Sequence, residues 1–226
     1  MTSERDRTII DSWGKNASPW TAAVRDGELE SRILVTDQAI VDAVLSCSPD
    51  SVLDLGCGEG WLVRELASRV TRAVGVDAIP ALIDQARRAG GGEFIVASYE
   101  GILNGSVDGQ FDVAVCNFSL FGKEVVESLF AAVPSLLRPG GLFVVQTLHP
   151  LVANGESAYL DGWRDGSWAG FGPDFVDPPP WYFRTVDNWL ALFSAYGFGL
   201  RDILEPMNPK TGKPASIIVV AGAVAG

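Results

Sequence analysis

The sequence predicts an α/β domain in which a mostly parallel sheet is covered by helices on both faces. Two observations favour this class. Short strands without a polar face alternate with helical patterns between residues 51 and 147, which is typical of a parallel sheet buried between two layers of helices. The first strand also ends in a glycine-rich turn that leads into a helix. A chain of 226 residues is most simply one domain with one well-buried core.

The elements can be placed in chain order. Helical patterns around Thr8–Trp13 and Thr21–Arg25 are expected to be broken by Gly14 and by Ser18-Pro19, and a new helix is expected to start at Thr36-Asp37. The alternation that follows comprises strand 51–55, helix 60–69, strand 72–77, helix 79–89, strand 93–97, strand 111–116, helix 124–137 and strand 141–147. No repeat or low-complexity segment interrupts it.

The C-terminal part continues this pattern more loosely. Pro134 is expected to kink or restart the helix in which it lies. A further helix is expected over 186–196. Two strands over 198–205 and 215–222, joined by the turn-rich segment Pro206–Pro214, are expected to end the sheet.

Composition narrows the function. The formal net charge is −11 and no cluster of Lys or Arg is visible, so we expect no nucleic-acid partner. The N-terminus is too polar for a secretory signal, and the apolar tail 216–226 is too short to span a bilayer. Three cysteines match no metal signature, which favours small buried side chains in a reducing cytoplasm and no metal site.

The stretch from Ser51 to Trp61, which reads SVLDLGCGEGW, carries the strongest functional signal. Its G-x-G-x-G spacing differs from the G-x-G-x-x-G of dinucleotide sites. Asp54 stands two residues before the first glycine, where a carboxylate would repel a pyrophosphate and suit an ammonium or a sulfonium. Asp77 ends the second strand, where an acid can accept both hydroxyl groups of a ribose. The turn and the two acids are together much more specific than any one of them.

Val52–Leu62 followed by Gly75–Asp77 resembles the first two motifs of class I S-adenosylmethionine-dependent methyltransferases. Residues 111–117 (FDVAVCN) resemble the fourth-strand motif of that family, and residues 136–141 (LLRPGG) resemble its turn before the fifth strand. The resemblance implies a Rossmann-like, seven-stranded, mostly parallel sheet with a terminal antiparallel hairpin. It divides the single domain into N-terminal helices (1–46), a cofactor-binding core (51–148), an aromatic-rich insertion over the acceptor site (150–184), and a C-terminal helix and strand pair (185–226).

The resemblance also implies which residues bind S-adenosylmethionine. The glycine turn would hold the methionyl part, Asp77 the ribose, and Ser98 with Tyr99 the adenine, although the family commonly has an acid near Ser98. Asn117 and Phe118 follow the fourth strand, beyond which ligands of open α/β sheets lie. An ordinary strand end or turn is the competing interpretation for these four. The full expected set is Asp54, Gly56, Cys57, Gly58, Gly60, Asp77, Ala78, Ser98, Tyr99, Asn117 and Phe118.

The acceptor side offers fewer signals. His149, the only histidine, follows the predicted fifth strand at the edge that carries the glycine turn. It could remove a proton from a hydroxyl acceptor, orient an acceptor that needs no base, or be structural. Residues 151–180 are rich in glycine, proline and aromatics, and a long connection without periodicity is usually functional or disordered. We expect it to wall the acceptor pocket rather than only pin a loop to the surface. Expected acceptor-side residues are Trp20, Trp163, Trp168, Tyr182 and Arg184.

Two of these residues have open alternatives. Trp20 either anchors the N-terminal segment or helps to close the cofactor pocket, and Arg184 either binds an acidic group of the acceptor or serves as a cap or ion-pair partner.

These observations predict methyl transfer from S-adenosylmethionine to an oxygen or nitrogen of a small, largely apolar molecule, with S-adenosylhomocysteine as the product. The sulfonium already activates the methyl group, so the protein must chiefly align the acceptor with it. A non-catalytic module that binds the cofactor or a partner is one alternative. An NAD-dependent oxidoreductase is another, and Asp54 and the glycine spacing disfavour it.

Overall fold

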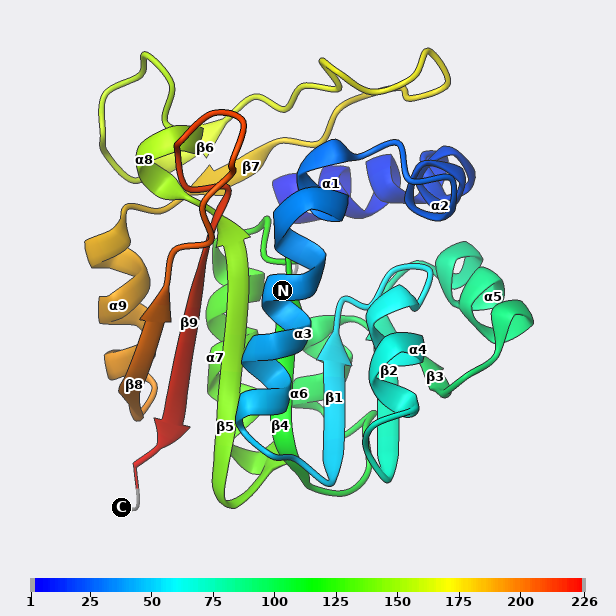
Figure 1. Ribbon diagram of the computed structural model, residues 1–226, viewed down its shortest axis with the longest axis vertical. Coiled ribbons are helices and arrows are strands. Elements are labelled where there is room, and N and C mark those ends of the chain that lie inside the picture. The colour runs from blue at the N-terminus through cyan, green and yellow to red at the C-terminus, as the bar shows by residue number, and fades with distance from the viewer. Residues whose placement is uncertain (1–2, 225–226) are drawn as a thin grey trace.

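The computed structural model describes residues 3–224 and is built around a seven-stranded sheet of order β3-β2-β1-β4-β5-β9-β8 (Figure 1). Strands β1 to β5 pair in parallel, and β9 runs antiparallel to both β5 and β8. The strands are β1 Ser51–Leu55, β2 Arg72–Asp77, β3 Glu93–Val96, β4 Phe111–Asn117, β5 Leu137–Leu148, β8 Phe198–Leu204 and β9 Ser216–Ala223. The predicted mostly parallel sheet with a terminal antiparallel pair is confirmed.

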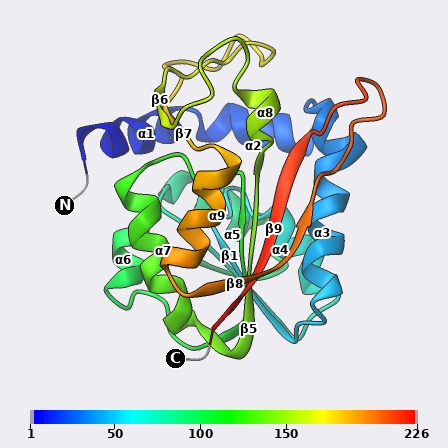
Figure 2. The same ribbon diagram turned by 90° about the vertical axis from the view of Figure 1, so that its left-hand side faces the viewer.

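Helices cover both faces of this sheet, as the edge-on view in Figure 2 shows. One face carries α3 (Asp37–Ser46), α4 (Trp61–Ala67) and α5 (Pro80–Ala89), and the other carries α6 (Tyr99–Leu103), α7 (Glu124–Leu136) and α9 (Val186–Ala195). Alternate residues of β1 serve the two layers. Val52 packs with α3 and α4, whereas Leu53 and Leu55 pack with α7. Burial on both sides explains why the strands read as unbroken apolar runs.

The helices α1 (Glu4–Lys15) and α2 (Ala17–Arg25) lie across the carboxyl ends of the strands (Figure 1). The breaks expected at Gly14 and Ser18-Pro19 are wrong. Gly14 lies in the last turn of α1, and Pro19 lies in the first turn of α2, where its missing N–H would have no partner in any case. The helix α7 continues through Pro134 to Leu136, so it does not restart there, and the proline removes one backbone hydrogen bond.

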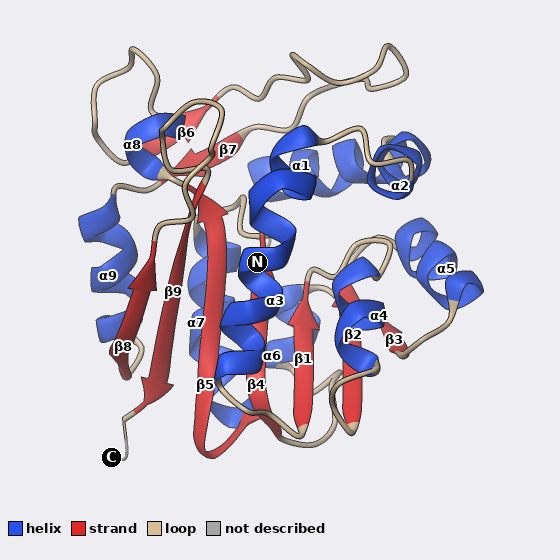
Figure 3. Cartoon of the chain, in the orientation of Figure 1, coloured by secondary structure: helices blue, strands red, loops and turns tan. Residues whose placement is uncertain are grey.

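Several short elements were not predicted. A π-helical turn, η1 (Arg32–Thr36), precedes α3, and the single turn α8 (Pro150–Ala153) follows β5. Inside the insertion, β6 (Gly162–Arg164) and β7 (Trp181–Phe183) form a separate antiparallel pair, seen at the top of Figure 3. Among the described residues, no helix combines the length and apolar character needed to cross a membrane.

Candidate functional site

The glycine turn between β1 and α4 is held tightly at the carboxyl edge of the sheet. Gly56, Gly58 and Gly60 have φ values of 82°, 57° and 83°, a region that side chains disfavour. The backbone N–H of Gly56 donates to the carbonyl of Val76 over 2.7 Å. A Cβ added to Gly56 would come within 2.3 Å of the Cβ of Ser119. The backbone path of this turn therefore requires glycine at these positions.

Asp77 lies at the open side of this turn. Its carboxylate accepts hydrogen bonds from the backbone N–H groups of Gly58 (2.9 Å) and Ile79 (2.8 Å). Burial raises the pKa of Asp77, and these N–H bonds oppose that rise. Each carboxylate oxygen retains a lone pair for a further donor, and both Asp77 and the neighbouring Ala78 remain partly exposed. An acid fixed in this way can receive the hydroxyl groups of a ribose.

Asp54 lies beneath the turn and is 2% exposed. Its Oδ1 atom is buried without a hydrogen-bond partner. Burial, with a smaller contribution from the charge of Asp77, raises the pKa of Asp54 to about 8. The side chain is therefore mostly protonated near neutral pH, and it would become a carboxylate if a cationic group lay beside it. Cys57 is also buried here, which raises the pKa of its thiol well above the ordinary value, so it acts as a small neutral side chain.

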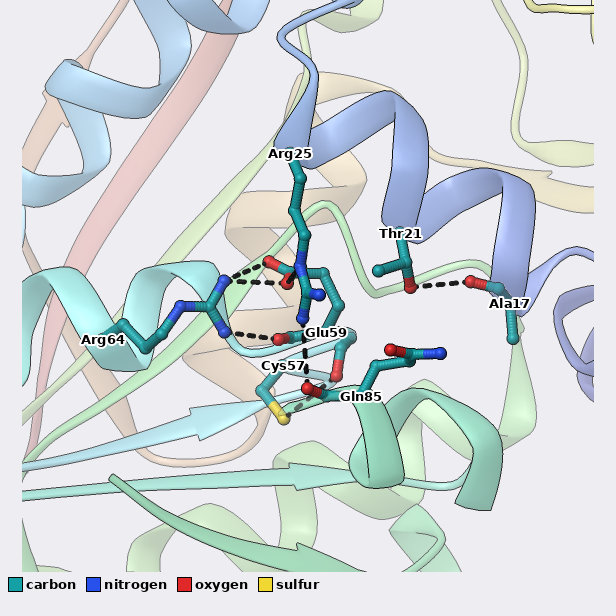
Figure 4. Close-up of polar contacts among 8 residues, drawn as sticks. Ala17, Thr21, Arg25, Cys57, Glu59, Arg64 and Gln85 are labelled. Carbon is teal, nitrogen blue, oxygen red and sulfur yellow. Dashed lines mark hydrogen bonds and ion pairs between the residues drawn. The ribbon is translucent and has the colours of Figure 1, made fainter. Parts of the chain in front are cut away.

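A buried acid in the turn is neutralised by two arginines (Figure 4). The Glu59 side chain is fully buried, and its carboxylate receives Arg64 at 2.7 Å and Arg25 at 2.9 Å. Arg25 comes from α2 and also donates to the carbonyl of Gln85 over 3.1 Å. This ion-pair group ties the N-terminal segment to the glycine turn. The sequence analysis missed Arg25 and Glu59, because nothing local in the sequence links residues 34 positions apart.

Two further side chains approach the turn from the N-terminal segment. The indole nitrogen of Trp20 lies 3.6 Å from the position that a Cβ on Gly58 would occupy. Arg32 stacks over the rings of Trp61 (4.7 Å) and Trp20 (5.8 Å) and donates to Asp37 over 2.9 Å. Its Nη2 atom is buried and has no partner. Arg32 is thus a cationic donor with unused capacity beside the turn.

The residues expected at the adenine behave differently from one another. The Ser98 hydroxyl caps α6 by accepting from the N–H of Gly101 over 3.1 Å, which leaves its own hydrogen free to donate. The Tyr99 hydroxyl instead faces the carbonyls of Leu55 (3.4 Å) and Ser119 (3.2 Å). The single hydrogen of this hydroxyl is directed to these carbonyls, so the Tyr99 side chain links the end of β1 to the segment that follows β4.

The end of β4 carries a backbone strain and a side-chain network. Phe118 has a φ of 51°, which is an outlier for a bulky residue and is typical of functional sites. The Asn117 Oδ1 atom accepts from the side chain of Gln146 over 3.0 Å, and that amide also donates to the carbonyl of Thr36 over 3.1 Å. Asn117 is thereby fixed at the carboxyl edge of the sheet, beside the point between β1 and β4 where the strand order reverses.

His149 follows β5 at this edge and is 2% exposed. Its Nε2 atom lies 2.7 Å from the Oε1 atom of Glu205. Its Nδ1 atom is buried without a partner. Glu205, which follows β8, was missed by the sequence analysis.

Aromatic residues of the insertion stack on the N-terminal helices rather than standing free. Trp168 lies 5.7 Å from Trp13 and 4.9 Å from Phe175, and Trp20 lies 6.4 Å from Phe171 (ring centroids). We call these five residues, Trp13, Trp20, Trp168, Phe171 and Phe175, the aromatic cluster. Two hydrogen bonds hold the insertion on the N-terminal helices. The Asn16 side chain donates to the carbonyl of Val176 over 2.8 Å and accepts from the N–H of Val176 over 2.9 Å. The insertion and the N-terminus thus form one cover above the strand ends.

The remaining acceptor-side candidates lie in the small β6–β7 sheet and beside it. Trp163 packs against Tyr182 at 5.5 Å and beneath Arg5 at 4.8 Å. Arg184 is 2% exposed and donates to the carbonyls of Gly122 (3.0 Å) and Lys123 (3.1 Å). Burial lowers the pKa of Arg184. Its guanidinium thus binds the backbone inside the fold through two of its nitrogen atoms.

Residues 52–141 match the family model described as a methyltransferase domain. Over this segment the chain is similar to S-adenosylmethionine-dependent methyltransferases. An uncharacterized methyltransferase of Schizosaccharomyces pombe is 29% identical over 70% of this chain and 63% of its own length. The ubiquinone biosynthesis O-methyltransferase of Methylococcus capsulatus is 30% identical over 62% of this chain and 61% of its own length. The chain thus spans less than two thirds of these curated relatives.

A solved methyltransferase structure shares this fold. The 1,6-didemethyltoxoflavin-N1-methyltransferase of Burkholderia thailandensis, solved with bound 1,6-didemethyltoxoflavin and S-adenosylhomocysteine, superposes with a TM-score of 0.60 at 21% identity. The match covers 93% of this chain and 88% of that one. Within the described residues 3–224, no group of three or more His, Cys, Asp or Glu side chains is placed to hold a metal ion.

Proposed function

We propose that this protein transfers the methyl group of S-adenosylmethionine to an oxygen or nitrogen of a small, largely apolar molecule. One observation carries the proposal. Around a single glycine turn lie a buried acid with an unpaired oxygen (Asp54), a fixed acid at the open side (Asp77) and a cation with an unused donor (Arg32). These charges complement the three polar parts of the cofactor, namely its cationic groups, its ribose and its carboxylate.

Each residue then has a defined task. Gly56, Gly58 and Gly60 let the backbone approach the methionyl part, and Asp77 accepts the ribose hydroxyls. Arg32 binds the carboxylate, and the free hydrogen of the Ser98 hydroxyl is available to the adenine. When bound, S-adenosylmethionine supplies an electrophilic methyl group. The protein contributes orientation and exclusion of water, which the cover formed by α1, α2 and the insertion favours.

The acceptor class is supported by two relatives. The names of the ubiquinone biosynthesis O-methyltransferase and of the toxoflavin N1-methyltransferase specify oxygen and nitrogen acceptors on small molecules. The net charge of −11 disfavours nucleic acid as the acceptor. All three cysteines are free, which supports the expected cytoplasmic location.

Calorimetric titration with S-adenosylhomocysteine tests the donor site. We expect micromolar-range binding by the wild-type protein and a loss of at least tenfold, about 1.4 kcal/mol, in Asp77→Ala, because the ribose loses its acceptor. Asp84→Ala removes an exposed acid from α5 and should bind normally. Absence of binding to the wild-type protein, or preferential binding of NAD, would reject the proposal. Equal binding by Asp77→Ala would reject only the ribose assignment.

A further inference from the structure

We propose that Glu205 positions His149 as a general base for a hydroxyl acceptor, so that methyl transfer goes to oxygen. This inference rests on the proposed function and deepens it. It adds a positioning residue that lies outside the glycine turn, and it selects one acceptor class from two.

The geometry assigns the two imidazole nitrogens different tasks. The Nε2 atom of His149 lies 2.7 Å from the Glu205 carboxylate, which can only accept, so Nε2 carries the hydrogen. In the neutral ring the Nδ1 atom then holds the lone pair. That atom is buried and has no partner in the protein. A buried acceptor without a donor is costly, and a hydroxyl group of a bound molecule would satisfy it.

The sheet topology explains how the two side chains meet. In the sheet β9 lies between β5 and β8. His149 directly follows β5 and Glu205 directly follows β8, so their hydrogen bond crosses over the start of β9. At that point Ser216 pairs with Leu148, and its hydroxyl oxygen is also buried without a partner. Two unsatisfied polar atoms from neighbouring parts of the sheet, His149 Nδ1 and Ser216 Oγ, thus lie at the carboxyl edge.

A cavity lies near this bridge, and its lining includes neither His149 nor Glu205. Its volume is about 490 Å³, and its lining includes Ser31, Val152, Lys213 and Ala215. Two of these are near neighbours of the bridge. The N–H of Val152 donates to the His149 carbonyl over 2.9 Å, and the N–H of Ala215 donates to the carbonyl of Pro206 over 2.8 Å. The volume lies within the range of small-molecule sites.

The two side chains differ in exposure, which suits the transfer of a proton during a reaction. The His149 side chain is 1% exposed, whereas the Glu205 side chain is 58% exposed. A proton accepted at Nδ1 makes the ring cationic inside the protein, and the carboxylate on its other side compensates that charge. Because Glu205 also meets water, it connects the buried ring to solvent.

The step balances without a further reactant. The acceptor oxygen forms a bond to the methyl carbon, and the carbon–sulfur bond breaks with its electron pair going to sulfur, which becomes a neutral thioether. The hydroxyl proton moves to Nδ1 of His149. A neutral amine is a stronger nucleophile than a neutral hydroxyl and can lose its proton after the methyl group has arrived, so it has less need of this base.

The first test needs no acceptor, because the protein has a single histidine. Long-range proton–nitrogen NMR of the neutral ring reports which nitrogen carries the hydrogen. We expect the Nε2–H form in the wild-type protein and a mixture of both forms in Glu205→Ala. An Nδ1–H ring in the wild-type protein, or an unchanged ring in the variant, would overturn the proposal.

The second test compares hydroxyl and amine acceptors in a panel. His149→Gln should lower kcat for hydroxyl acceptors by about 10²–10⁴-fold, the range of general-base catalysis. Glu205→Gln should lower it about tenfold with KM nearly unchanged, since charge rather than binding is lost. Asp202→Asn, an exposed acid on β8, is the matched control.

The outcomes separate the two proposals. If the wild-type protein does not bind S-adenosylhomocysteine, the proposed function is rejected. Normal binding with turnover of amines alone, or hydroxyl turnover that is equal in wild type and Glu205→Gln, would reject the base and leave the proposed function intact.

Discussion

Replacement of Asp54 by asparagine should stabilise the ligand-free protein at alkaline pH. The acid is 2% exposed and its pKa is raised from 3.8 to about 8 by burial and by the charge of Asp77. An acid with a raised pKa binds its proton more tightly in the folded protein. Folding is therefore most favourable below the unfolded pKa near 4, and the free energy of unfolding falls as pH rises from there to about 8.

The magnitude follows from the width of that window. Each pH unit inside it corresponds to about 1.4 kcal/mol. Between about pH 5 and about pH 8 the wild-type protein should therefore lose up to about 4 kcal/mol through this one group. Asparagine has nearly the same shape and no charge, so Asp54→Asn should not show this loss. Its advantage over the wild-type protein should be largest near pH 8.

Urea unfolding at the two pH values measures the difference. Asp108→Asn, which alters an exposed acid, is the control and should follow the wild-type pH dependence. If Asp54→Asn also follows the wild-type dependence, Asp54 does not titrate as a buried acid and the reasoning fails. If the variant is less stable than the wild-type protein near pH 8, the interactions lost with the acid outweigh the free-energy cost of charging Asp54 in the interior. This outcome also refutes the reasoning.

Two further predictions concern the segments that close the site. Arg25→Ala should lower the free energy of unfolding by only about 1 kcal/mol, because Glu59 keeps Arg64 as a partner and the Arg25 side chain is 38% exposed. The same variant should bind S-adenosylhomocysteine more weakly in calorimetry. An unaltered affinity would show that the contact between α2 and the glycine turn does not support binding. Arg184→Met should lower the free energy of unfolding, measured in urea, by about 1–3 kcal/mol, because two backbone carbonyls lose their donor. A variant with wild-type stability would show that these two bonds do not stabilise the fold, and it would favour a role of Arg184 in acceptor binding.

The sheet was predictable because its signals are local. Runs such as Val52–Leu55 and Phe111–Asn117 are apolar on both faces, and the positions of Asp54 and Asp77 relative to the turn follow directly from strand ends. These residues could therefore be placed from the sequence, and the structure brings both to one edge.

The contacts that close the site were not predictable, because they join distant parts of the chain. Arg184 binds carbonyls about 60 positions away, and Asn16 binds Val176 across 160 positions. An arginine near the end of the insertion is equally compatible with a ligand site or with backbone carbonyls. Tyr99 illustrates the same limit, since its hydroxyl is directed to carbonyls that only the assembled sheet provides.

The junction between α1 and the insertion also has a consequence for biosynthesis. The first helix leaves the ribosome early, but the partner of Asn16 is synthesised 160 residues later. The parallel strands β1 to β5 are synthesised in the meantime. Until the insertion has been synthesised, Trp13 and Trp20 lack the aromatic residues that cover them in the folded protein, which exposes apolar surface. The N-terminal helices therefore acquire this cover only after the insertion has been synthesised, and β8 and β9 follow later still.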